Sequence, residues 1–118
     1  MNVLIIGGSK GIGAALVKEL DSRGIGGCFT YFSSEKRARH LQESSSAWKT
    51  IRLDLSSDLN QQVLKITSKP KVLVFTSAAG LEAVKDSKHS YAVNSSGPSR
   101  LLMALDRTSH CPESVVFV

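Results

Sequence analysis

The chain has 118 residues, of which 42% are hydrophobic and 21% charged, and its formal net charge at pH 7 is +5. This length suffices for one hydrophobic core, and the composition excludes a collagen-like, coiled-coil or wholly disordered protein. No apolar run approaches the roughly 18 residues that span a bilayer. We therefore expect a single domain over residues 1–118, with no membrane segment and no signal peptide.

Apolar runs predict five strands separated by segments of helical periodicity. The strands are expected at residues 2–6, 27–32, 48–53, 72–76 and 115–118. Such alternation of strand and helix predicts a parallel sheet with helices on both faces. We expect an α/β fold, a Rossmann-like doubly wound sheet in the order 3-2-1-4-5, with the last residues inside its fifth strand.

Helical segments connect the predicted strands. The first has one apolar face and a glycine C-cap, the second and third begin at serine caps, and the fourth covers about residues 91–108. The positions concerned are Ile12, Ala15, Leu16, Leu20 and Gly24 in the first, Ser33 or Ser34 and Glu43 in the second, and Ser56 or Ser57 with Leu59, Val63 and Ile66 in the third.

A glycine-rich segment, Gly7-Gly8-Ser9-Lys10-Gly11-Ile12-Gly13, joins the first strand to the first helix. There the first glycine permits a tight turn, the second lets the backbone approach a phosphate, and the third lets the helix pack close to the sheet. Free N–H groups and the helix dipole then face an anion. An ordinary glycine-rich turn is the alternative, but the flanking strand and helix favour nucleotide binding.

This segment resembles the cofactor loop of the short-chain dehydrogenases/reductases, and further motifs follow in that family's order. Asp54-Leu55 resembles the position that the family places against adenine, and Ala79-Gly80 matches the end of its Asn-Asn-Ala-Gly motif. The segment from Val93 to Pro98 is similar to its V-N-x-x-G-P helix. The resemblance implies a dinucleotide-binding domain, with cofactor contacts at Gly7, Ser9, Lys10, Gly11, Ile12, Gly13, Asp54, Leu55, Ala79 and Gly80.

The end of the second strand favours NADP(H) over NAD(H). NAD-binding relatives of this fold place an acid there for the ribose hydroxyls, and residues 30–34 contain none. Lys10 resembles the basic residue of NADP-preferring members, while Arg37, Ser33 and Ser34 are placed to bind a 2′-phosphate. A solvated helix face and an N-cap are the alternative interpretations of Arg37 and the serines.

The family's catalytic Tyr-x-x-x-Lys has no counterpart here, because Glu35 follows Tyr31 and Ser95 follows Tyr91 at that spacing. The family's serine follows the fifth strand, where these residues end. Asn94 alone resembles a catalytic residue of the family, and Pro98 leaves its carbonyl free for a water relay. A kinked helix start with Asn94 as N-cap is the alternative. The chain resembles an oxidoreductase, but we expect it to be inactive alone.

The net charge and the C-terminal residues bear on partners and setting. Lysine and arginine in excess favour anionic partners, but nucleic acid is not expected because residues 36–40 contain no interleaved aromatics. We expect a homodimer through the uncharged edge strand 115–118 or the apolar last helix. An interaction module that kept the fold and lost its cofactor is the alternative function.

Cysteine usage gives the remaining expectations. Cys28 and Cys111 both stand beside apolar residues, and we interpret them as buried thiols of a cytoplasmic protein. Two scattered cysteines and three distant histidines offer no ligand spacing, so no metal site is expected.

Overall fold

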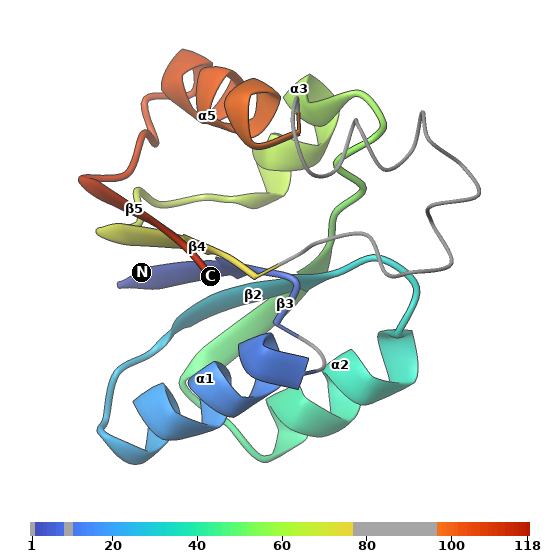
Figure 1. The fold of residues 1–118 in the computed structure, drawn as a ribbon, viewed down its shortest axis with the longest axis vertical. Helices are drawn as coiled ribbons and strands as arrows, with labels where there is room; N and C mark the ends of the chain where they lie inside the picture. The colour runs from blue at the N-terminus through green and yellow to red at the C-terminus, as the bar shows by residue number, and fades with distance from the viewer. Residues whose placement is uncertain (1, 9–10, 77–96) are drawn as a thin grey trace.

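The computed structural model describes residues 2–8, 11–76 and 97–118. Its strands are β1 (Val3–Ile6), β2 (Gly27–Tyr31), β3 (Trp48–Arg52), β4 (Val72–Phe75) and β5 (Ser114–Phe117). Its helices are α1 (Gly11–Ser22), α2 (Glu35–Glu43), α3 (Leu59–Gln62), the 3-10 turn η1 (Val63–Lys65) and α5 (Gly97–Arg107). The sheet lies between two helical layers, with α1 and α2 on one face and α3 and α5 on the other (Figure 1).

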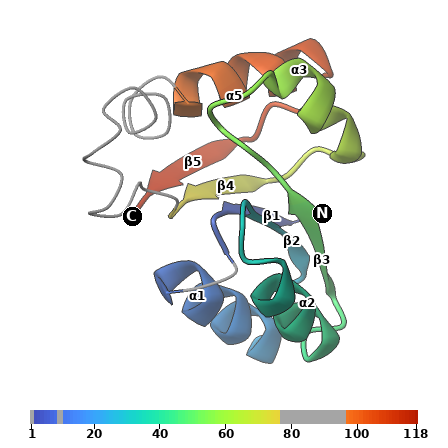
Figure 2. The ribbon, with the colours of Figure 1, turned by 90° about the vertical axis from the view of Figure 1, so that its right-hand side faces the viewer.

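The five strands lie in the order β3-β2-β1-β4-β5, and each pairs in parallel with its neighbours. This confirms the predicted doubly wound sheet. β1 is central, with Val3 paired to Gly27 of β2 on one side and to Val72 of β4 on the other (Figure 2). All carboxyl ends therefore meet at one edge, and the ends of β1 and β4 flank the switch point where such folds bind ligands.

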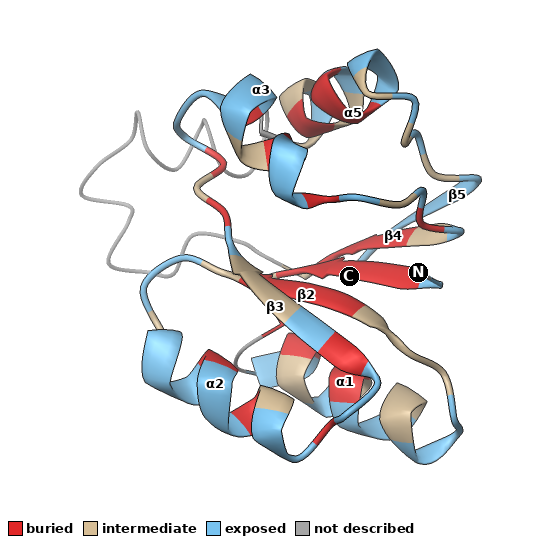
Figure 3. Cartoon of the chain, turned by 180° about the vertical axis from the view of Figure 1, so that it is seen from behind, coloured by how far each residue is buried: buried red, intermediate tan, exposed pale blue. Residues whose placement is uncertain are grey.

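The core has two layers because alternate residues of β1 point to opposite faces of the sheet. All four residues of β1 are buried, as the continuous apolar run predicted (Figure 3). Val3 and Ile5 belong to the cluster under α1 and α2, which also contains Phe29 and Trp48. Leu4 and Ile6 belong to the cluster under α3 and α5, with Leu55, Leu73, Leu101 and Leu105 among its members.

The predicted apolar face of α1 is confirmed only in part. Leu16 and Leu20 are partly buried and pack against the core as predicted, whereas Ile12 is 64% exposed and Ala15 is also exposed. The fully buried residues of the helix are Gly13 and Val17, which the prediction did not include. The close approach of the helix to the sheet at Gly13 turns the packed face toward these two residues.

The end of α1 is as predicted. Gly24 has a φ of 75°, in the left-handed region that glycine adopts without strain. Its N–H donates to the carbonyl of Asp21, and the N–H of Ile25 donates to the carbonyl of Leu20. This pair of bonds is the Schellman motif, so the glycine C-cap is confirmed.

The predicted cap of α3 is wrong. Asp58 is the N-cap, and its carboxylate accepts a hydrogen bond of 3.0 Å from the N–H of Asn60. Ser56 and Ser57 instead donate to the carboxylate of Asp54. The apolar positions of the predicted face are nevertheless all buried: Leu59, Val63 and Ile66.

The C-terminal elements leave apolar surface exposed. Leu101 and Leu105 of α5 are buried, but Met103 is 60% exposed. Every residue of β5 is exposed, and the ring of Phe117 stacks on Phe75 at 5.2 Å between centroids. An uncharged edge strand of this kind is open to further pairing.

The two cysteines differ, which corrects one expectation. Cys28 is buried, but Cys111 is exposed, because it lies in the turn between α5 and β5 rather than in the core. No helix among residues 2–8, 11–76 and 97–118 is both long and apolar enough to cross a membrane.

Candidate functional site

The glycine segment turns sharply at the carboxyl end of β1. Gly7 has a φ of 90° and Gly11 a φ of 61°, both in the left-handed region where side chains are disfavoured. The N–H of Gly7 donates to Oγ1 of the buried Thr30 at 3.0 Å, and the N–H of Gly8 donates to its carbonyl at the same distance. The start of the turn is thereby fastened to β2.

Gly13 brings α1 into direct contact with this turn. A Cβ added there would stand 2.4 Å from the carbonyl oxygen of Gly7, 2.7 Å from Cα of Gly8 and 2.8 Å from Oγ1 of Thr76. Thr76 itself donates through Oγ1 to the carbonyls of Ile6 and Gly7, so these atoms are fixed. The close packing predicted for the third glycine is therefore confirmed.

Gly11 stands in the opposite situation. Apart from its chain neighbours and the backbone of its own helix, no atom of residues 2–8, 11–76 and 97–118 lies within 4 Å of the position that its Cβ would occupy. The neighbouring Ile12 is 64% exposed, and the first N–H groups of a helix lack partners within it. The N-terminus of α1 thus presents amides and an apolar side chain beside an open space. Ser9 and Lys10, also predicted here, lie outside the described residues.

The end of β2 holds three further predicted residues. Ser33 is exposed, and Ser34 is the N-cap residue of α2, although its side chain makes no capping bond. Arg37 lies on α2 and lines a hollow of about 230 Å³ between α1 and α2, together with Lys18 and His40. The structure therefore groups Arg37 with two other basic residues.

Arg52 is a basic residue at this edge that the sequence interpretation missed. It ends β3 and is paired in register with Tyr31, the last residue of β2. Its Nε donates to the carbonyl of Phe32 at 3.1 Å, and its guanidinium lies 5.0 Å from the centre of the Phe32 ring. The sequence contained a signal for it. Arg52 lies at the end of the predicted third strand, and the carboxyl ends of neighbouring parallel strands meet at one edge of the sheet, so Arg52 could have been expected beside the end of the second strand.

Asp54 and Leu55 follow β3 in the loop of residues 54–58, which we call the Asp54 loop. The carboxylate of Asp54 accepts from the N–H of Ser56 at 2.9 Å, from Oγ of Ser56 at 2.6 Å and from Oγ of Ser57 at 2.8 Å. Partial burial raises the pKa of Asp54, but these hydrogen bonds and the charge of Arg52 outweigh it and hold the pKa below its usual value. Leu55 is buried.

The remaining predicted residues, Ala79, Gly80 and Asn94, lie outside the described residues. Within the described part of the chain, no three His, Cys, Asp or Glu side chains come together in a way that would hold a metal ion. The described site thus consists of the N-terminus of α1, Arg52 beside the end of β2, Arg37 on α2 and an oriented carboxylate after β3.

Comparisons with known proteins show what the chain as a whole is similar to. No protein-family model matches the chain. The cyclic-di-GMP-binding biofilm dispersal mediator protein of Escherichia coli (strain K12) is 32% identical over 79 residues, which are 67% of this chain and 33% of that protein. The chain therefore spans about a third of this curated relative.

Solved structures similar to this chain include BdcA and a short-chain dehydrogenase/reductase. The crystal structure of BdcA in complex with NADPH superimposes with a TM-score of 0.75 and 27% identity, covering 90% of this chain and 46% of that one. A short-chain dehydrogenase/reductase from Serratia marcescens BCRC 10948 gives a TM-score of 0.73 and 29% identity, covering 89% and 49%. In both cases the chain spans about half of the relative.

Proposed function

Because the chain belongs to the short-chain dehydrogenase/reductase family and matches its N-terminal Rossmann portion, we propose that it binds a dinucleotide coenzyme, NADP(H) in preference to NAD(H). The observation that carries this proposal is the contrast between two glycines on one helix turn. Gly13 is packed against backbone, while Gly11, at the N-terminus of α1, has no described residue beyond its own helix and chain neighbours within 4 Å of its Cβ position. A pyrophosphate placed there would accept N–H bonds and meet the positive end of the helix dipole.

The adenosine half would lie over the ends of β2 and β3. The Asp54 carboxylate and Leu55 would border the adenine, as the family resemblance implies. Ser33, Ser34, Arg37 and Arg52 would surround a 2′-phosphate, for which arginine is the preferred partner. The NADPH complex of the relative BdcA supports this preference.

The nearest acid after β2 does not oppose a 2′-phosphate strongly. Glu35 is the first acidic residue after that strand, and its Oε1 lies 2.7 Å from Nη2 of Arg39. Both side chains of this ion pair are exposed, so the pair adds little stability. The positive charge of Arg39 nevertheless offsets the negative charge of Glu35, which would otherwise repel the phosphate. This supports NADP(H) over NAD(H).

The nicotinamide half would extend toward the end of β4, where we propose contacts with Ala79 and Gly80 and, for Asn94, the family's proton-relay role. Residues 1–118 contain no Tyr-x-x-x-Lys, whose tyrosine is the family's acid and base. We therefore propose that this chain, as one domain over 1–118, binds coenzyme without transferring hydride by itself.

The proposal is tested by isothermal titration of the chain with NADPH, NADH and cyclic di-GMP. We expect NADPH to bind more tightly than NADH. Cyclic di-GMP is included because the Escherichia coli relative is named for binding it. If cyclic di-GMP bound and neither coenzyme did, the ligand of this site would be a cyclic dinucleotide and the coenzyme proposal would be wrong. Absence of heat with all three ligands would also refute the proposal.

A matched pair of variants locates the binding. Gly11 begins α1 and Gly24 follows its end, and both have positive φ. At either glycine a Cβ would meet no atom of the described residues within 4 Å, apart from its chain neighbours and its own helix backbone. G11A and G24A should each lose about 1 kcal/mol of stability, the cost of the left-handed region for alanine. Only G11A should weaken NADPH binding, by about tenfold or more. Equal affinities of the two variants would place the coenzyme elsewhere.

We further propose that the chain forms a homodimer through the edge of β5. Val115, Val116, Phe117 and Val118 are 37%, 44%, 67% and 64% exposed, although their sequence is that of a strand buried on both faces. V116K should shift sedimentation at micromolar concentration to the monomer, whereas M103K on α5 should not. A monomeric wild type would contradict the dimer, and dissociation by M103K alone would place it on α5.

A further inference from the structure

Arg100 of α5 reaches across to the Asp54 loop, 45 residues earlier in the chain. Its Nη2 donates to the carbonyl of Leu55, and its Nη1 lies 3.5 Å from the carbonyl of Ser57. The side chain thus spans two carbonyls of the loop that follows β3. Both carbonyls lie beyond the end of β3, where the backbone no longer pairs within the sheet and its polar groups need other hydrogen-bond partners.

A second side chain holds the two ends of the same loop. Oε1 of Gln62 accepts from the N–H of Asp54 at 2.6 Å, and its Nε2 donates to the carbonyls of Asp54 and Asp58, each at 2.9 Å. Gln62 therefore closes the loop from α3, while Arg100 holds its middle from α5. The conformation of the loop depends on these two side chains.

The orientation of the Asp54 carboxylate depends in turn on the middle of the loop. The carboxylate is held by the N–H and hydroxyl of Ser56 and the hydroxyl of Ser57. Arg100 contacts the carbonyls on either side of Ser56. If Arg100 released them, the serines would no longer be fixed in the positions from which they donate to Asp54.

Arg100 holds this position at a cost. Its Nε is buried without a hydrogen-bond partner among the described residues. A buried unpaired donor on a cation is unfavourable, so the two contacts with the loop carbonyls have to offset this cost.

We propose that Arg100 is a positioning residue, which holds the Asp54 loop in the shape that receives the adenosine half of the bound dinucleotide. The inference rests on the proposed coenzyme site. Arg100 makes its contacts through the loop backbone, so it acts on the ligand through Asp54 and Leu55 rather than by touching it. It couples α5 to the adenosine end of the site.

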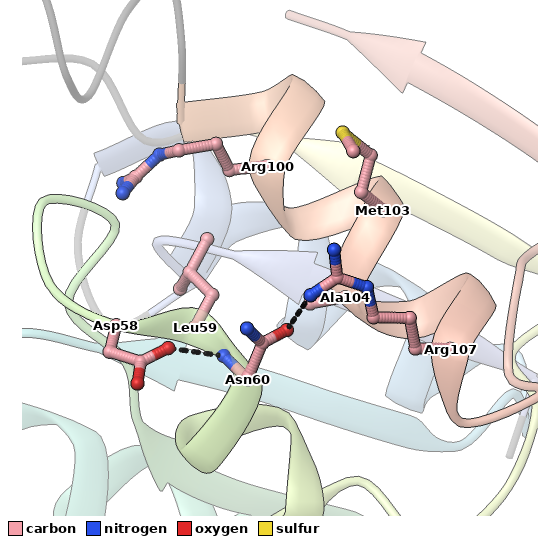
Figure 4. A pocket seen from close by; sticks show the side chains of 7 residues that line it. All are labelled: Asp58, Leu59, Asn60, Arg100, Met103, Ala104 and Arg107. Carbon is pink, nitrogen blue, oxygen red and sulfur yellow. Dashed lines mark hydrogen bonds between the residues drawn. The ribbon is translucent and has the colours of Figure 1, made fainter.

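Arg107 provides a matched control on the same helix. It lies seven residues after Arg100, two turns along the same face, and its Nη1 donates to Oδ1 of Asn60 at 3.0 Å (Figure 4). Arg107 therefore also joins α5 to α3, but its hydrogen bond goes to the helix rather than to the Asp54 loop. Both residues border the same small hollow of about 160 Å³ between the two helices.

The binding test compares R100M and R107M by isothermal titration with adenosine 2′,5′-bisphosphate and with nicotinamide mononucleotide. The first probe carries only the adenosine end of NADP(H), and the second only the nicotinamide end. We expect R100M to weaken adenosine bisphosphate binding about tenfold, as for loss of one or two hydrogen bonds that hold the loop in shape. Nicotinamide mononucleotide should bind unchanged, and R107M should bind both probes like the wild type.

A second readout needs no ligand. The Asp54 carboxyl can be titrated by ¹³C NMR in the free chain, where its pKa should lie below the ordinary value. In R100M the pKa should move back toward that value, and in R107M it should not. R100K keeps a donor for one carbonyl, should give an intermediate result, and replaces R100M if the latter does not fold.

The two readouts separate the inference from the proposed function. A wild type that binds neither probe would refute the coenzyme site, while the titration of Asp54 would still decide whether Arg100 shapes the loop. An Asp54 titration that is the same in wild type and R100M would overturn the positioning role. Adenosine bisphosphate binding that is the same in R100M and R107M would also overturn it.

Discussion

The contact between α1 and the glycine turn predicts the effect of a single methyl group at Gly13. In G13A the new Cβ would stand 2.4 Å from the Gly7 carbonyl oxygen, so the helix must retreat by at least about 0.6 Å to reach 3.0 Å. Two of the obstructing atoms are backbone and the third is Oγ1 of Thr76, and all are fixed by the hydrogen bonds of Thr30 and Thr76. Overpacking of this kind costs about 1–3 kcal/mol, and better helix propensity returns at most about 1 kcal/mol. Because the obstructing atoms are fixed, the upper end of the overpacking cost applies, and we expect a net loss of about 2 kcal/mol.

Urea denaturation followed by the fluorescence of Trp48 measures this loss, because Trp48 is the single tryptophan and is 1% exposed. A loss of 2 kcal/mol corresponds to a fall of about 8 °C in Tm for a domain of this size. G11A is the control, since within the described part of the chain its methyl group meets no atom within 4 Å outside its own helix and chain neighbours, and its φ of 61° is unfavourable for alanine. G13A as stable as the wild type would refute the close packing at Gly13.

Three further outcomes follow from single groups. T30V removes the acceptor of the Gly7 N–H and should destabilise the fold by about 1–3 kcal/mol in urea titrations, whereas T30S should not. A disulfide reagent at pH 8 should modify Cys111 alone in the native chain, because Cys111 is exposed and Cys28 is buried. Burial raises the pKa of Cys28 to about 11 in the folded chain, so the free energy of unfolding should fall as the pH rises from 9 toward 11. The lowered pKa of Asp54 contributes stability at neutral pH that is lost below its usual value of 3.8, and D54N should reduce this loss in acid unfolding.

The order of the sheet could be predicted from the sequence because each strand is a local pattern. The run from Val3 to Ile6 is apolar at every position, and a strand buried on both faces requires that. The helix face of α1 could not be chosen in the same way. Ile12 and Leu16 recur at helical spacing, as do Gly13 and Val17, and a glycine carries no hydrophobic signal although its lack of a side chain places it nearest the sheet.

The errors at the Asp54 loop have a different cause. Serine is a common N-cap, and Ser56 and Ser57 stand just before the helical residues, so they fitted the local rule. They were nevertheless recruited by the carboxylate of Asp54, which left the cap to Asp58. The path of the loop decides whether a serine or Asp58 accepts from the first N–H groups of the helix. That path depends on Arg100, a side chain 45 residues away. No local pattern contains this information.

The charges around the site explain why the net charge alone was a weak guide. Arg23 and Arg39 each lie within an i,i+4 ion pair with a glutamate, so their charges are offset locally. Among the described residues, Arg37 on α2 and Arg52 at the end of β3 lie in no ion pair. Arg52 nevertheless acts on the carboxylate of Asp54, whose pKa it lowers, so part of its charge is offset as well. The placement of acids beside bases, more than the excess of bases, therefore sets which charges a phosphate of the proposed coenzyme would meet.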